Sequence, residues 1–313
     1  MIKKIIFFGQ GPHAKFTYDW TKKNNLDFFF ITSPRLKSQI DVKKLLSFKC
    51  KHLITKKVTL KELKKICNSG TIAISAGAPF IFSEEVINLF NGNIFNLHNA
   101  PLPAVRGGAS ISWMILEGKK KWTSTIHKIE KGIDSGNILM VKNIKFPKEI
   151  KFPIDYINFI WEKDLILLDN FLNKLFHNAK IKELKQNEEK SIYYPRLNAK
   201  VNGWINFLWK GEHIERFVFA FSYDYDGARS YINNNLIKIF SVKSKKNINE
   251  TKHPFIVGVI FKIKNKNLYL HTIDGILIIY KYVCKAKIKA GDRIYTPSKM
   301  LDSALSERVF FNP

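Results

Sequence analysis

Cysteine is scarce in this chain of 313 residues: only Cys50, Cys67 and Cys284 occur, far apart from one another. Without a C-x-x-C pair, the sequence excludes a disulfide framework and a cysteine-based zinc site. Widely spaced cysteines are typical of proteins in a reducing compartment. We therefore expect a cytoplasmic protein that holds no metal.

Long hydrophobic runs are also missing. The longest apolar stretches, such as residues 5–9 and 276–280, suit a β-strand and are too short for a membrane-spanning helix. The N-terminus begins with two lysines, as a signal peptide does, but its apolar run is too short and meets Gly11-Pro12. We predict neither a membrane span nor a signal peptide.

Arginine is the third shortage. Of the 52 basic residues only seven are arginines, which leaves 45 lysines in a chain of net charge +26. A surface selected for nucleic acid is usually richer in arginine, because the guanidinium binds phosphate through two hydrogen bonds and stacks on bases. The lysines are spread along the whole chain, which favours solvated background charge. We do not expect nucleic acid as the main partner, although the lysine excess leaves an RNA substrate open.

Hydrophobic and aromatic residues are plentiful, at 45% and 13%, and the length suits two domains. In residues 1–188 strands alternate with helices, which predicts an α/β domain with an open, mostly parallel, Rossmann-like sheet. The expected strands there are residues 3–9, 28–32, 71–76, 94–98, 124–129 and 138–144. In residues 189–313 short strands are separated by turns, which predicts a small β-barrel of the OB-like kind as the C-terminal domain.

A glycine-rich turn follows the first expected strand. It resembles the opening of a dinucleotide fingerprint, but residue 14 is alanine where the third glycine would stand. The pattern favours an ordinary strand-to-helix turn over NAD binding. Since helix N-termini bind anions, we still assign a substrate phosphate to Gly9, Gln10, Gly11, Pro12 and His13.

Asn96 and His98 lie two residues apart in the expected strand 94–98, so their side chains project to the same side. The carboxyl end of such a strand is where open α/β sheets place their sites. Asparagine supplies an amide donor for a developing oxyanion, and histidine can take up or release a proton near neutral pH. Taken alone, the pair is better explained by a structural histidine.

Asp134 lies 36 residues after His98, between Gly132 and Gly136. The flanking glycines favour a loop in which the carboxylate can approach another group closely. A carboxylate beside His98 would orient the imidazole and raise its pKa. On its own, the Gly-Ile-Asp-Ser-Gly segment is equally well explained as an ordinary turn.

The three segments Asn-x-His (96–98), Leu-Pro-x-x-Arg-Gly (102–107) and Gly-x-Asp-x-Gly (132–136) occur here in order. In this combination the chain resembles the formyltransferases that use N10-formyltetrahydrofolate. Residues 75–82 resemble the folate-side loop of that family, and residues 195–207 and 214–228 resemble the domain junction and barrel entry of its two-domain members. One departure is Ala100-Pro101, where the family commonly has Ser-Leu.

The resemblance implies that a primary amine attacks the formyl group of N10-formyltetrahydrofolate, the expected co-substrate. The implied catalytic residues are Asn96 and His98, which hold the oxyanion, and Asp134, which orients His98 and helps to move the proton. The residues implied in pterin binding are Phe80, Phe82, Ile129, Glu130 and Lys131. Arg106, in the Leu-Pro-x-x-Arg-Gly segment, is expected to contact the amine substrate.

The acceptor amine is less clearly indicated. The transfer-RNA members of the family carry a basic insertion after the second strand, whereas residues 33–50 here are short and hold one arginine. This favours a nucleotide-linked amino sugar, of the kind used for surface polysaccharides such as O-antigen, and Tyr223 and Tyr225 could pack on its sugar or base. The alternatives left open are a methionyl-tRNA formyltransferase, a formyltetrahydrofolate hydrolase and a non-enzymatic RNA-binding protein. A homodimer also remains open.

Overall fold

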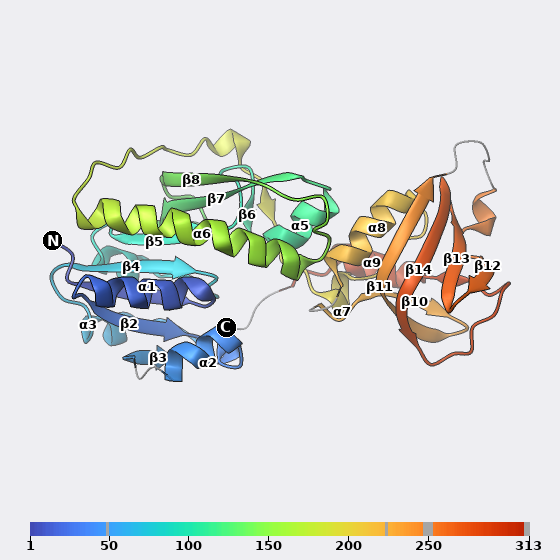
Figure 1. Cartoon of the computed structure of the whole chain (residues 1–313), viewed down its shortest axis with the longest axis horizontal. Helices are drawn as coiled ribbons and strands as arrows, with labels where there is room; N and C mark the ends of the chain where they lie inside the picture. The colour runs from blue at the N-terminus through green and yellow to red at the C-terminus, as the bar shows by residue number, and fades with distance from the viewer. Residues whose placement is uncertain (48–49, 223–224, 247–252, 310–313) are drawn as a thin grey trace.

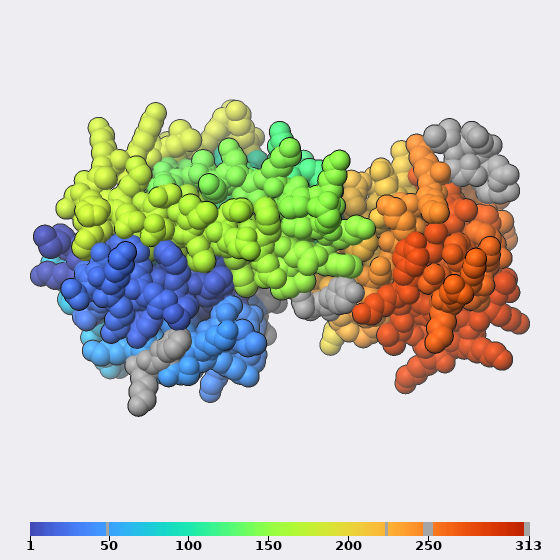
Figure 2. All heavy atoms as spheres, viewed as in Figure 1, coloured from blue at the N-terminus to red at the C-terminus, as the bar shows by residue number. Residues whose placement is uncertain are grey.

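The computed structural model describes residues 1–47, 50–222, 225–246 and 253–309. The chain folds into two lobes arranged end to end, the first built from N-terminal and the second from C-terminal residues (Figure 1). A narrower waist separates the two lobes on the face shown in Figure 2. The domain boundary between residues 188 and 189 stays our proposal; it lies between α6 (Pro153–Phe176) and α7 (Ala199–Asn202).

Among the described residues, the sheet of the first lobe has seven strands in the order β3-β2-β1-β4-β5-β7-β8. They are β1 (Lys4–Gly9), β2 (Asp27–Thr32), β3 (His52–Ile54), β4 (Thr71–Ala76), β5 (Ile94–His98), β7 (Lys121–Lys128) and β8 (Ile138–Lys145). The strands from β3 to β5 run parallel, whereas β7 and β8 are added antiparallel. The predicted open, mostly parallel sheet is confirmed.

Both faces of this sheet are covered by helices, which explains why β1 is a continuous apolar run rather than an alternating one. Ile5 and Phe7 pack with residues of α1 (Pro12–Lys23), α2 (Ile40–Ser47) and α6. Ile6 and Phe8 point to the opposite face and pack with α3 (Leu60–Lys64) and α4 (Glu84–Leu89). Within the described residues, no helix is long and apolar enough to cross a membrane.

Several short elements bring distant segments to the carboxyl end of β5. β6 (Arg106–Gly107) pairs in parallel with β9 (Tyr193–Tyr194), so the chain returns to the first lobe before it enters the second. α5 (Ser110–Leu116) follows β6 directly. The 3-10 turn η1 (Pro34–Leu36) follows β2, and the 3-10 turn η2 (Glu188–Lys190) precedes β9. Sequence patterns did not predict β3, β6 or β9, because strands of two or three residues carry no periodicity.

The second lobe is an antiparallel sheet in the order β12-β13-β14-β11-β10-β15, curled around α8 (Gly211–Ala220) as a half-barrel (Figure 1). Its strands are β10 (Ala228–Ile232), β11 (Asn235–Lys246), β12 (Ile260–Lys264), β13 (Asn267–Thr272), β14 (Gly275–Cys284) and β15 (Ile294–Tyr295). The 3-10 turn η4 (Pro254–Ile256) precedes β12, and α9 (Ser298–Ser306) follows β15. This curled antiparallel sheet bears out the predicted C-terminal fold.

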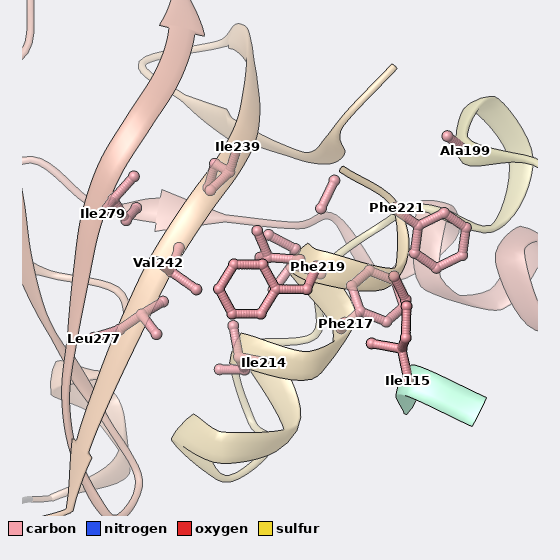
Figure 3. Packing of buried hydrophobic residues seen from close by; sticks show 14 of the residues in the cluster. Ile115, Ala199, Ile214, Phe217, Phe219, Phe221, Ile239, Val242, Leu277 and Ile279 are labelled. Carbon is pink, nitrogen blue, oxygen red and sulfur yellow. The ribbon is translucent and has the colours of Figure 1, made fainter. Parts of the chain in front are cut away.

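One hydrophobic cluster crosses from the first lobe to the second. Ile115 of α5 belongs to the same buried cluster as Phe217 and Phe219 of α8 and Phe221 just beyond it. Figure 3 shows Ile115 beside Phe217 and Phe221, while Phe219 points toward Val242 of β11. Because these side chains share one core, the packing fixes how the lobes sit against each other.

Candidate active site

A cavity of about 580 Å³ opens at the carboxyl ends of β4 and β5, where an open α/β sheet is expected to bind its ligands. The loop after β4 and the loop between β7 and β8 form two of its walls. Ala199 and Phe221, from α7 and the end of α8, close it from the second lobe. The C-terminal lobe is therefore part of the site.

Asn96 and His98 both line this cavity, as their spacing in β5 predicts. Leu97 between them points into the core and is only 3% exposed. The antiparallel register of β5 and β7 places His127 directly opposite Asn96. The Asn96 amide Nδ2 donates a hydrogen bond to His127 Nε2 over 3.1 Å, which orients the amide at the cavity wall.

Asp134 completes the group from the loop between β7 and β8, and its backbone adopts a left-handed φ of 53°. Its Oδ2 accepts a hydrogen bond from the Gly107 amide at 3.0 Å and lies 3.7 Å from His98 Nδ1. Its Oδ1 lies 3.6 Å from His127 Nε2. The three residues that the sequence singled out thus meet at one point, together with a second histidine.

The hydrogen bonds indicate which ring nitrogens carry protons. His98 Nε2 donates to the Val105 carbonyl at 3.1 Å, because a carbonyl oxygen can only accept. His127 Nδ1 donates in the same way to the Lys128 carbonyl at 2.7 Å. In a neutral His98, Nδ1 is therefore the nitrogen with a free lone pair, and it faces Asp134 and the cavity.

The electrostatics of the site differ from the sequence expectation in one respect. Burial lowers the pKa of His98, and the neighbouring His127 lowers it further, so the raising effect of Asp134 is outweighed. Asp134 does raise the pKa of His98, as predicted, but burial leaves the net pKa lowered. For Asp134, burial raises the pKa, but the nearby His98 and His127 and the hydrogen bond from the Gly107 amide hold it well below its usual range.

His127 is the residue that the sequence analysis missed. Its imidazole is buried between Asn96 and Asp134 and lines the cavity. Its ring centroid lies 6.2 Å from that of His98 in an edge-to-face arrangement. The only sequence signal for it was a histidine near the end of the strand that precedes the Gly-x-Asp-x-Gly loop. Its partners depend on strand register, which the sequence does not display.

Of the residues assigned to pterin binding, Phe80, Phe82, Ile129 and Glu130 line the cavity. Phe82 packs edge-to-face on Phe8 with ring centroids 4.9 Å apart, so its ring is anchored to the sheet. Lys131 is different, because it is absent from the cavity lining and its side chain is 85% exposed. Its Nζ forms a surface ion pair with Glu84 at 3.4 Å.

The first strand-to-helix turn contributes one side chain to the cavity, Gln10, whose Oε1 is buried without a hydrogen-bond partner among the described residues. Gly9 and Gly11 shape the turn instead. Gly9 has a φ of 125°, and a Cβ there would overlap the Ala76 carbonyl. Pro12 begins α1, and the buried His13 lies 3.2 Å from Asp164 of α6, outside the cavity lining.

Arg106 is buried, with 7% of its surface exposed, and does not line the cavity. Its NH1 donates to Glu188 at 2.7 Å, and its NH2 donates to Gln186 and Glu188 at 2.8 Å each. Gln186 in turn donates to the Asp134 and Gly136 carbonyls at 2.8 and 2.7 Å. The arginine therefore braces the loop that carries Asp134 and lies outside the cavity lining.

Replacing Arg106 by methionine is expected to lower the free energy of unfolding by about 1–3 kcal/mol, because the buried Gln186 would lose its donors. A Glu188→Gln variant should change the stability far less, because the Glu188 side chain is largely exposed. Urea unfolding followed by circular dichroism measures both. Equal and small effects of the two changes would contradict this role of Arg106.

Two arginines that the sequence analysis passed over line the cavity, Arg35 of η1 and Arg196 beyond β9. Of the two tyrosines proposed as substrate contacts, Tyr225 also lines it, and Tyr223 lies outside the described residues. Arg35 and Arg196 are separated by about half of the chain, so only the fold brings them to one cavity.

Three comparisons with known proteins bear on these features. Residues 3–149 match the family described as formyl transferase, and residues 199–294 match the family described as formyl transferase, C-terminal domain. The methionyl-tRNA formyltransferase of Clostridium tetani is 27% identical over 219 residues, covering 70% of this chain and 67% of that protein.

Two solved structures share the fold over their whole lengths. One is WlaRD, a sugar 3N-formyl transferase in the presence of dTDP and 5-N-formyl-THF, with a TM-score of 0.68 at 24% identity, covering 92% of this chain and 99% of that one. The other is the N-formyltransferase from Helicobacter canadensis with folinic acid and dTDP-3-aminofucose, with a TM-score of 0.69 at 21% identity, covering 90% and 100%. With both family matches in order along most of its length, the chain belongs to the formyl transferase family and is a formyl-transferring enzyme.

Proposed function

We propose that the enzyme transfers the formyl group of N10-formyltetrahydrofolate to the primary amine of a nucleotide-linked amino sugar. The observation that carries the chemistry is the meeting of Asn96, His98 and Asp134 at one end of the cavity. The acceptor is supported by the solved sugar N-formyltransferases that share this fold along their whole length.

The cavity suits a folate co-substrate. Phe80, Phe82 and Ile129 form an apolar wall that can cover a pterin ring, and the same loops present backbone groups beside it. The buried Oε1 of Gln10 lacks a hydrogen-bond partner within the described residues. It can therefore accept a hydrogen bond from an N–H group of a bound pterin ring. The two solved relatives named above hold a formylated folate or folinic acid. Bound folate supplies an electrophilic formyl carbon.

The residues at the end of the cavity then have separate roles in the transfer. A neutral His98 can accept the proton of the attacking amine at Nδ1, because its Nε2 proton is held by Val105. Asp134 stays ionised and stabilises the imidazolium that forms. Asn96 donates its amide to the oxyanion, and the protonated His98 then returns the proton to the leaving nitrogen.

The alternative acceptor is methionyl-tRNA, which is supported by the 27% identity to the methionyl-tRNA formyltransferase of Clostridium tetani. In that case the region after β2 would have to grip an acceptor stem. Here the described part of it consists of η1 and the two-turn α2, with Arg35 as its one arginine. This compact segment favours a small acceptor over a transfer RNA.

An acceptor screen with N10-formyltetrahydrofolate tests the proposal. Nucleotide-linked amino sugars on dTDP, UDP and GDP are compared with charged initiator transfer RNA, and products are identified by mass spectrometry. We expect one amino sugar to gain a formyl group, while the matching sugar with a hydroxyl in place of the amine does not react. Formylation of methionyl-tRNA without formylation of any amino sugar would overturn the assignment.

A further inference from the structure

A second cavity of about 1450 Å³ lies beside the active-site cavity at the junction of the lobes. The two cavities share part of their lining, including Phe80, Tyr193 and Arg196. A single ligand can therefore have one end at His98 and the other end in the second cavity. The proposed acceptor has to extend beyond the active-site cavity, because about 580 Å³ must already hold a formylated folate and the reactive amine.

The wall of the second cavity is unusually rich in aromatic rings. Of the six tryptophans in the chain, Trp113, Trp204 and Trp209 line it. Trp113 is held by a hydrogen bond from its Nε1 to the Pro195 carbonyl at 2.8 Å. Trp204 stacks on Tyr231 with ring planes 7° apart. Flat, fixed rings of this kind bind the faces of nucleobases with little regard to base identity.

The charge of the same wall is positive. Five lysine and arginine side chains line it, against the two glutamates Glu117 and Glu307. Glu117 is already engaged, because it accepts a hydrogen bond from the Tyr194 hydroxyl at 2.6 Å. An aromatic cavity with an excess of cations fits a nucleotide better than an apolar ligand.

Arg196 stands where the two cavities meet. Its side chain lies across Gly108, where a Cβ would overlap it, so the glycine leaves room for the arginine. Arg35 lines the active-site cavity and is close enough for the Arg196 charge to lower its pKa, in addition to a larger effect of burial. Two arginines at one cavity favour the binding of an anion between them.

We propose that the second cavity holds the nucleoside of the sugar nucleotide and that Arg196, with Arg35, binds its diphosphate at the passage to the active site. This assignment rests on the proposed function, because it places the nucleotide part of the same acceptor whose amino sugar is formylated. The base packs against the tryptophan-lined wall, and the diphosphate passes Arg196. The amino sugar then lies beside His98 and Asp134.

Binding of free dTDP, UDP and GDP to the whole protein tests this without any turnover. Tryptophan fluorescence is a direct readout, because half of the tryptophans line the cavity. We expect at least one nucleoside diphosphate to quench it saturably, and its nucleoside without phosphates to bind at least about tenfold more weakly. A Trp113→Phe variant should lose part of the quenching while calorimetry still detects binding.

Arg196→Gln is expected to raise the Kd for the nucleoside diphosphate by roughly tenfold or more, with folinic acid affinity unchanged. Arg293→Gln is the matched control, because Arg293 is a half-buried arginine of the second lobe that lines neither cavity. Equal effects of the two variants would overturn the proposal, as would binding of a CCA trinucleotide in place of any nucleoside diphosphate.

The outcomes separate this proposal from the proposed function. If a nucleoside diphosphate binds through Arg196 and no amino sugar is formylated, the cavity assignment stands and the acceptor assignment fails. If an amino sugar is formylated and Arg196→Gln changes neither nucleotide affinity nor the KM for that sugar, the cavity assignment fails alone.

Discussion

A His98→Ala enzyme is expected to turn over on the order of 10²-fold more slowly than the wild type, or worse, with its fold intact. The Nδ1 lone pair of His98 faces Asp134 while its Nε2 is fixed to a backbone carbonyl, whereas the corresponding lone pair of His127 already accepts a hydrogen bond from Asn96. Removing the ring takes away both the proton acceptor and the imidazolium that forms from it. Loss of one such catalytic group typically lowers the turnover rate by this factor.

The measurement is kcat from the rate of formyl-folate consumption at saturating acceptor. His52→Ala is the matched control, because His52 is an exposed histidine outside both cavities. Circular dichroism and unfolding midpoints show whether each variant is folded. Asn96→Ala should lose turnover to a similar degree through the missing oxyanion donor. Near-normal turnover in a folded His98→Ala protein would contradict the assignment.

Replacing Asp134 by asparagine is also expected to have a large effect, lowering kcat on the order of 10²–10⁴-fold. The amide keeps the shape and can still accept from the Gly107 amide, but it carries no charge to stabilise the imidazolium of His98. The loss should appear in kcat more than in KM, because the charge on His98 forms only during the reaction.

The Asp134→Asn substitution should also shift the pH profile of kcat in a defined direction. Proton acceptance requires neutral His98, so turnover rises as pH increases through the pKa of His98, which burial places below the ordinary imidazole value of about 6.5. Asp134 partly opposes that lowering. In Asp134→Asn the opposing charge is gone, so the acid limb of the kcat profile should move to still lower pH. A shift of this limb to higher pH would contradict the role of the Asp134 charge in stabilising protonated His98.

The architecture of this enzyme could be predicted because its signals are local and repeated. The apolar run of β1 and the alternation of strands and helices up to β5 indicated a sheet covered on both faces. The two-residue spacing of Asn96 and His98 placed both side chains in the cavity. Asp134 was found through the flanking glycines, one of which avoids a clash with the Lys128 carbonyl.

What could not be predicted depends on contacts between distant segments. His127 reaches the site only through the register of β7 against β5. Arg106 reads as a ligand contact in the sequence, and its partners Gln186 and Glu188 lie 80 and 82 residues away. The pKa of His98 likewise depends on burial, which outweighs the nearby carboxylate that the sequence suggested.

The second lobe contributes to the site as well as to stability. Phe221 lies in the core shared by the lobes and lines both cavities. Ala199 of α7 lines the active-site cavity and belongs to the same core. The candidate active site therefore includes residues of both lobes.

The most direct test of the central claim is whether folate turnover depends on an amine. Purified enzyme is mixed with N10-formyltetrahydrofolate, and tetrahydrofolate and formate are measured with and without the amino-sugar acceptor found in the screen. We predict that tetrahydrofolate forms only with the acceptor, in equal amount to the formylated product, and that His98→Ala abolishes this coupled reaction. Release of formate at the same rate without acceptor would show that water is the true acceptor and would contradict formyl transfer.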